Sequence, residues 1–180
     1  MSDDLLVNRV DIGSDVIDLS SYLPRQLLGL QVSALAELRR RKIVRTNNAP
    51  AGDYAELLFA TAFNWSLSSN SASGHDAVDG ENKRYQIKCR RITAQNPSRQ
   101  LSALRRLDGK PFDYLAAVLF GAHFEVTRAA IIPHEVVLAH STFTPHVNAH
   151  RFLLRDSVWE IAGVRDVTQA IKRSESVLNT

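Results

Sequence analysis

The stretch Gly74-His75-Asp76-Ala77-Val78-Asp79 leads through a polar turn, residues 80–83, into Arg84-Tyr85-Gln86-Ile87-Lys88. The turn composition predicts a hairpin, with the Asp76 carboxylate at the start of its first, short strand. Gln86 and Lys88 are two residues apart and therefore project from one face of the second strand. The hairpin thus gathers a carboxylate, an amide oxygen and an ammonium, the set of groups that a divalent cation and a water attacking phosphorus require.

The segments around this hairpin alternate between helical and strand patterns. The nearly continuous apolar run Phe112 to Phe120 predicts a central strand that is covered on both faces. Leucines at spacing three favour a helix from Pro97 to about Leu107. The other expected elements are a helix from Gly52 or Asp53 to Phe63, strands at 65–70, 75–79, 83–91 and 124–132, and helical segments at 133–140 and 156–174. This order predicts an α/β sandwich with a mixed central sheet flanked by helices.

At 180 residues the chain is expected to form one domain. Its N-terminal part has two further features. Residues 1–22 form an acidic arm, either ordered or loose. Residues from Pro24 to about Lys42 have a helical pattern, and that helix ends in the cations of residues 39–42, which complement its dipole. The polar loop 46–50 follows as a hinge.

The composition indicates an ordinary globular protein, 44% apolar and 23% charged. No apolar run reaches the length of a membrane span, and the acidic N-terminus lacks the build of a signal peptide. Cys89 is the only cysteine, so an intrachain disulfide is excluded and a cytoplasmic location is expected. We find no zinc motif and no glycine-rich phosphate loop.

Charge is segregated along the chain although the net charge is only +3. Residues 51–82, which contain Asp76, carry five acids and no base, whereas residues 25–50 carry six bases and residues 83–110 carry nine. Basic segments on both sides of an acidic one would attract a phosphate backbone, and the acidic segment between them would attract a metal ion. A single basic run is more often the solvated face of a helix. The arginines expected to contact DNA are Arg39, Arg40, Arg41, Arg90, Arg91, Arg99, Arg105 and Arg106.

The hairpin resembles the motif of the PD-(D/E)XK nuclease superfamily, with His75-Asp76 for Pro-Asp and Gln86-Ile87-Lys88 for (Asp/Glu)-X-Lys. More loosely, residues 39–113 look like a family of small bacterial nuclease-like proteins whose substrate is unassigned. In that family a GDYAE helix precedes GxDxxD, RYQIKxR and NPSRQLS. The resemblance implies a restriction-endonuclease-like αβββαβ core and a DNA endonuclease, with a homodimer as the form that cuts two strands.

The same resemblance implies roles for individual residues. Asp76 and Glu56, the latter on the helix before the strands, would hold Mg²⁺, with Mn²⁺ as an alternative ion. The Gln86 side chain and the Ile87 carbonyl would complete the ligands, and Lys88 would position the attacking water. Asp79 is the competing carboxylate. It lies three residues after Asp76, and therefore on the opposite face of the strand, and it directly precedes Gly80, so we assign it to the turn.

Two alternatives to the nuclease remain open from the sequence. Gln86 removes one negative charge from the usual motif, so the same fold could bind nucleic acid without cutting it. Lys88 could instead be structural, in an ion pair with Asp76 or Glu56. In that case the ligand need not be a nucleic acid, and binding would lack a steep salt dependence. Cys89 is expected to be a small core residue and not a nucleophile.

Overall fold

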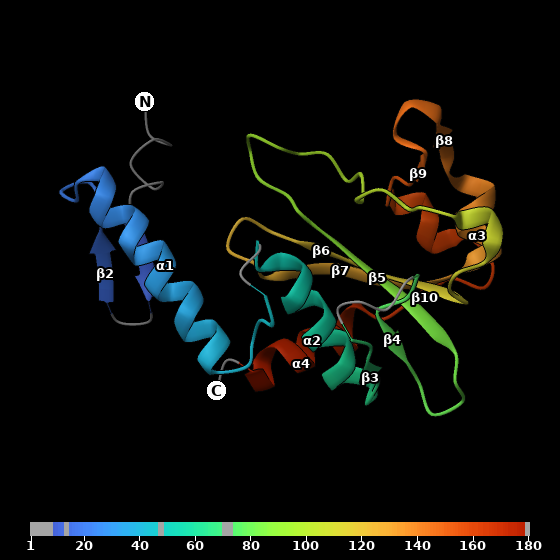
Figure 1. The fold of residues 1–180 in the computed structure, drawn as a ribbon, viewed down its shortest axis with the longest axis horizontal. Helices are drawn as coiled ribbons and strands as arrows, with labels where there is room; N and C mark the ends of the chain where they lie inside the picture. Colours follow the sequence, from blue (N-terminus) through green and yellow to red (C-terminus); the bar gives the residue numbers. More distant parts are fainter. Residues whose placement is uncertain (1–8, 13–14, 47–48, 70–73, 179–180) are drawn as a thin grey trace. The chain divides into compact units, whose positions relative to one another are not determined.

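A mixed sheet runs through the C-terminal part of the chain, with strand order β10-β7-β6-β5-β4-β3 (Figure 1). The computed structural model describes residues 9–12, 15–46, 49–69 and 74–178. Contacts divide the chain into two compact units, Met1–Asn47 and Asn48–Thr180, and the boundary lies in the loop predicted as a hinge. Each unit is described by itself.

The N-terminal unit consists of a hairpin and a long helix. Strands β1 (Arg9–Ile12) and β2 (Asp15–Asp18) pair antiparallel. Helix α1 (Pro24–Arg40) begins with proline in its first turn, and the side-chain oxygen of Gln26 accepts the Leu23 N–H at 2.8 Å. The predicted helix is therefore confirmed, and part of the predicted arm is an ordered hairpin. The first eight residues of that arm lie outside the described residues.

The C-terminal unit begins with helix α2 (Ala51–Phe63) and the short strands β3 (Ser66–Leu67) and β4 (Ala77–Val78). Asp53 lies in the first turn of α2, and Pro50 occupies the cap position. Strand β5 (Arg84–Arg91) pairs antiparallel with β4 on one side. On its other side β5 pairs in parallel with β6 (Tyr114–Phe120), which pairs antiparallel with β7 (Val126–Pro133). The α/β class with a mixed central sheet is thus confirmed.

Strand β6 is the centre of the unit, because both of its faces are buried. Ala116, Val118 and Phe120 pack in one core with residues of α2 and of α4 (Thr168–Leu178). Leu115, Ala117 and Leu119 pack in a second core on the opposite face. The second core also takes residues from α3 (His134–His140) and from the segments around β8 (Thr142–Thr144) and β9 (Ala149–Arg151). Figure 1 shows α2 and α4 on one side of the sheet and α3, β8 and β9 on the other.

The helix predicted from Pro97 to Leu107 is wrong. The segment is irregular and extended up to a short 3₁₀ turn, η1 (Leu107–Gly109). Its leucines at spacing three are instead anchors in the second core, where the Leu101 and Leu104 N–H groups each donate at 3.0 Å to the backbone carbonyls of Phe152 and His150. The crossover from β5 to β6 therefore contains no α-helix in the described residues.

The helix predicted over 156–174 is also wrong in its first half. Residues Asp156–Glu160 form a 3₁₀ turn, η3, and β10 (Arg165–Asp166) adds an edge strand beside β7. The Thr168 hydroxyl begins α4 by accepting the Ala129 N–H at 3.0 Å, which ties the helix to β7. Only the second half of the predicted helix is therefore helical, and it extends to Leu178.

Candidate functional site

The backbone of Asp76 is fixed by both neighbouring strands. Its N–H donates to the Tyr85 carbonyl of β5 at 2.8 Å, and its carbonyl accepts the Ser68 N–H next to β3 at 2.8 Å. Asp76 directly precedes Ala77, which is fully buried on the α2 face of the sheet. Because alternate residues of a strand point to opposite faces, Asp76 lies on the other face, together with Gln86 and Lys88.

One oxygen of the Asp76 carboxylate receives two hydrogen bonds from β5. Asp76 Oδ2 accepts the Ile87 N–H at 2.6 Å and a short hydrogen bond from the Gln86 side-chain amide. Neither bond uses Oδ1. The structure thus brings together two of the side chains predicted for the site, at a partly exposed position.

The Ile87 carbonyl points to the same side of β5 as Asp76. Residues two apart on a strand direct their backbone groups to the same side, and Tyr85 and Ile87 both bond to Asp76. Strand β4 begins at Ala77 and pairs only with Arg84 and Tyr85, so it does not extend alongside Ile87. A carboxylate oxygen and an amide group therefore meet just before β4 begins, on the side of β5 toward which the Ile87 carbonyl points.

Lys88 lies on the same face of β5 as Gln86 and is half-buried. It is level with Ala117 of β6, on the face of the second core. Among the residues that the structure describes, no carboxylate lies within ion-pair distance of its ammonium. The ion pair that would make Lys88 purely structural is therefore not formed within this part of the chain.

Glu56 lies on α2, which covers the opposite face of the sheet from Gln86 and Lys88. Its charge acts on the Cys89 thiol and tends to raise the pKa of that group, whereas Lys88 tends to lower it. Glu56 and Lys88 are thus both near Cys89. The role of Glu56 as a metal ligand stays a prediction.

Asp79 has the turn role that its position before Gly80 predicts. Its Oδ1 accepts the Glu81 and Lys83 N–H groups, each at 2.9 Å, and its Oδ2 accepts the Tyr85 hydroxyl at 2.8 Å. Burial alone would raise the pKa of Asp79, but these hydrogen bonds outweigh it and the pKa lies below its ordinary value. Asp79 is therefore committed to the hairpin, and Asp76 is the carboxylate available for the site.

Cys89 packs against the core on the α2 face. Burial raises the pKa of its thiol to about 11, so the thiol is protonated near neutral pH. This agrees with the interpretation of Cys89 as a core residue. His75 is partly exposed beside Asp76.

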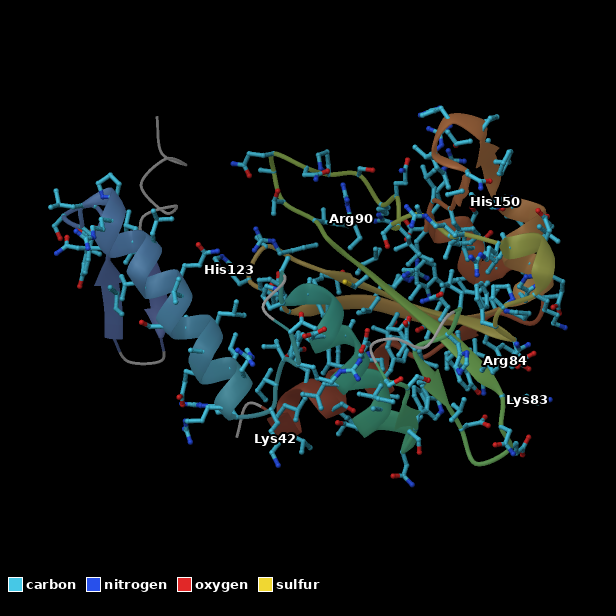
Figure 2. The ribbon with its side chains drawn as sticks, in the orientation of Figure 1. Lys42, Lys83, Arg84, Arg90, His123 and His150 are labelled. Carbon is cyan, nitrogen blue, oxygen red and sulfur yellow. The ribbon has the colours of Figure 1, made fainter. Side chains whose placement is uncertain are left out.

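The predicted DNA-contacting arginines differ in how their charges are used. Arg90, on the same face as Lys88, donates to the Ser98 carbonyl and to Asn96 Oδ1 and so holds the loop that leaves β5 (Figure 2). Arg99 forms an ion pair with Asp156 at 2.8 Å, and the Arg91 guanidinium lies 5.0 Å from the centre of the Phe124 ring.

The other arginines fall into two groups. Arg105 and Arg106 are exposed on the irregular crossover segment. Arg39, Arg40 and Arg41 belong to the N-terminal unit, where Arg40 and Arg41 share Glu37 at 2.7 and 2.8 Å. Arg105 and Arg106 are accordingly the least engaged of the predicted contacts in the C-terminal unit.

Sequence reasoning missed one structural pair beside the site. The Asp113 carboxylate accepts the Arg84 backbone N–H at 2.9 Å and its guanidinium at 3.3 Å, which joins the starts of β5 and β6. Hydrogen bonding from Arg84 holds the pKa of Asp113 below its ordinary value. The partners are 29 residues apart, so local spacing contains no signal for the pair.

Comparison with known proteins adds no family to this description. A scan against protein-family models finds no match, and neither does a search of curated proteins. Within the described ranges, no group of three or more His, Cys, Asp or Glu side chains is positioned to hold a metal ion. None of the described helices is both long enough and apolar enough to cross a membrane.

We expect Asp79→Asn to lower the free energy of unfolding at pH 7 by about 1–2 kcal/mol, because the amide accepts the three hydrogen bonds less well. The pKa of Asp79 is lowered in the folded state, so its stabilisation is present above the unfolded value of about 4 and is lost as the pH falls through the folded value. Urea unfolding of wild type and variant from pH 7 downward would check this. Asp108→Asn, at an exposed carboxylate, controls for the loss of one charge. A difference that stays constant into acid would contradict the assignment.

Proposed function

We propose that this chain is a metal-dependent nuclease of the PD-(D/E)XK type that hydrolyses phosphodiester bonds in DNA. The observation that carries the proposal is the contact of the Asp76 carboxylate with the Gln86 amide and the Ile87 N–H, on the side of β5 toward which the Ile87 carbonyl also points. Lys88 lies on the same face of the strand, without a carboxylate partner in the described part of the chain. A half-buried ammonium without a counter-ion is costly unless it serves a ligand, which supports a functional role.

The order of the elements supports the same superfamily. A helix, three antiparallel strands and a further strand parallel to the third follow one another, as in the αβββαβ core. The chain departs from that core in the crossover, which packs an extended segment on the sheet instead of a helix. Packing by Leu101, Leu104 and Leu107 supplies the apolar cover that the helix would otherwise give.

The residues at the site fit a hard cation such as Mg²⁺ or Mn²⁺. A carboxylate oxygen, an amide oxygen and a backbone carbonyl are the ligands that such ions prefer, and water fills their other positions. The Gln86 amide donates its N–H to Asp76 in this structure, so binding a cation requires that the amide turn to offer its oxygen. The role of Glu56 as a further ligand stays a prediction, because its helix covers the opposite face of the sheet from Gln86.

Each side chain of the site would then have its own role in hydrolysis. The cation, when bound, would stabilise negative charge on the scissile phosphate. Asp76 and Gln86 would hold it, and their attachment to β5 would keep them in place. The Lys88 ammonium would donate a hydrogen bond to the attacking water and so orient it toward phosphorus, while its charge offsets that of the phosphate. Cleavage of both strands would require two such sites, and hence a homodimer.

A binding module without cleavage is the second candidate, and one observation favours it. The Gln86 amide donates to the Asp76 carboxylate, so these two side chains contact each other without a cation. A protein of this kind would bind DNA equally well in the presence of EDTA and after Lys88→Ala.

We expect the wild type to nick supercoiled DNA with Mg²⁺ or Mn²⁺ but not with EDTA. Lys88→Ala and Asp76→Asn should each lower the rate by at least about 100-fold, because each removes a group that acts in the transition state. Gel assays of nicking would measure this. Lys172→Ala, at an exposed lysine of α4, is the matched control and should keep full activity. Equal activity in all four proteins would indicate a contaminant.

Gln86→Glu tests cation binding without relying on cleavage. The new carboxylate would lie against that of Asp76, so the metal-free variant should melt below the wild type. Mg²⁺ should then raise the Tm of the variant more than that of the wild type, because the cation relieves the repulsion. Calorimetry with EDTA and with Mg²⁺ would measure both shifts. The double variant Asp76→Asn/Gln86→Glu should lose the additional Mg²⁺ shift, and an unchanged shift would argue against a cation at these residues.

Arg105→Gln and Arg106→Gln should each weaken DNA binding and lower the slope of log K against log salt by about 0.9, the value for one lost phosphate contact on duplex DNA. Arg99→Gln should have a smaller effect on the slope, because Asp156 already pairs with that guanidinium. Fluorescence anisotropy over a range of salt concentrations would measure these slopes. Unchanged slopes in Arg105→Gln and Arg106→Gln would remove the crossover segment from the interface.

A further inference from the structure

A cavity of about 460 Å³ lies where β6 begins and β7 ends. Its lining combines basic, acidic and aromatic residues from several strands and loops: Lys83, Lys110, Asp113, Tyr114, Pro133, Glu135, Gly163 and Arg165. Tyr114 packs against the core on the α2 face of the sheet, whereas Gln86 and Lys88 project from the opposite face. The cavity is therefore a different place from the proposed catalytic site.

Positive charge in this cavity exceeds negative charge. Asp113 is neutralised by Arg84, with which it shares an ion pair and a backbone hydrogen bond. Lys83, Lys110 and Arg165 form no ion pair with any carboxylate that the structure describes. Glu135 is the remaining acid of the lining, so the cavity carries a charge of about +2 beyond its internal pairs.

The cavity is also held in place before any ligand binds. The Arg84 guanidinium donates to the Lys110 carbonyl at 3.1 Å, and the Asp113 carbonyl accepts the His134 N–H at 3.0 Å. The Arg165 guanidinium lies over the Tyr114 ring, 5.9 Å from its centre. Two basic residues of the cavity are thus positioned by contacts that leave their charge available to a ligand.

We propose that this cavity binds a phosphate monoester or inorganic phosphate through Lys83, Lys110 and Arg165. A phosphate monoester carries a charge near −2 at pH 7, which matches the excess charge of the cavity, whereas an internal phosphodiester carries only −1. Its oxygens accept hydrogen bonds from ammonium and guanidinium groups. Tyr114 also lines the cavity, and its hydroxyl would be a further donor. The ligand is either a small phosphorylated molecule or the terminal phosphate of a nucleic acid.

Calorimetric titration with inorganic phosphate, in EDTA and at constant ionic strength, tests the proposal directly. Wild type should bind saturably, and affinity should rise with pH as inorganic phosphate loses its second proton and becomes a dianion. Lys110→Gln and Arg165→Gln should each bind about tenfold more weakly, because each loses one charge-assisted hydrogen bond. Glu135→Gln should bind several-fold more tightly, because it removes the opposing charge of the cavity.

Two controls separate this site from general attraction and from misfolding. Lys172→Gln on α4 removes a positive charge elsewhere and should bind like wild type. Lys110→Gln should keep the circular dichroism spectrum and Tm of the wild type, so that a loss of binding in this variant is not a loss of fold. No saturable binding, or an equal loss in Lys172→Gln, would overturn the proposal.

The source of the phosphate is decided by oligonucleotides of one sequence with a 5′-phosphate or a 5′-hydroxyl end. Tighter binding of the phosphorylated strand, abolished by Arg165→Gln, would assign the cavity to a nucleic-acid end. Equal binding of the two strands, together with retained inorganic phosphate binding, would assign it to a small phosphorylated molecule. Asp76→Asn should leave phosphate binding unchanged, so a failure of the nuclease proposal and a failure of this one are distinguishable.

Discussion

The pairing of β5 with β6 is the constraint on which the rest of the C-terminal unit depends. Every residue of β6 from Leu115 to Phe120 is buried, so the chain must cover both faces of the sheet at this point. Helices α2 and α4 cover one face, and the crossover segment with α3, β8 and β9 covers the other. Apolar burial of this extent is the main stabilising term, and it fixes β5 along one side for its whole length.

The candidate site lies on the other side of β5. Strand β4 pairs only with Arg84 and Tyr85, so beyond that point the partner of β5 is a side chain, the Asp76 carboxylate, instead of a backbone. Because β4 is short, the Ile87 N–H donates to the Asp76 carboxylate and not to a backbone carbonyl. Asp79 fixes the turn at the other end of the hairpin, and the two acids have different tasks because they lie on opposite faces.

Local pattern predicts those parts of this fold that local forces form. The helix over 51–63, the alternation in β5 and the apolar run of β6 follow from periodicity and burial. The crossover segment and β10 do not, because their backbone groups bond to distant residues, and leucines at spacing three suit either a helix or an extended anchor. The Asp76–Gln86 contact follows from the predicted hairpin, whereas the Arg84–Asp113 pair and the basic cavity arise only from the tertiary arrangement.

Glutamine at position 86 stabilises the hairpin in the absence of a cation, whereas a carboxylate there would destabilise it. Two carboxylates at this distance repel each other unless a cation lies between them, so such a site is stable only when occupied or partly protonated. The Gln86 amide instead donates to Asp76 and stabilises the hairpin without a cation. The amide also contributes less to cation affinity than a carboxylate would, because it has no net charge. Under the proposed function, Gln86 would therefore lower the affinity for a cation while it stabilises the hairpin without one. A cation at these residues would then bind most tightly when a phosphate ligand adds further oxygen atoms and negative charge.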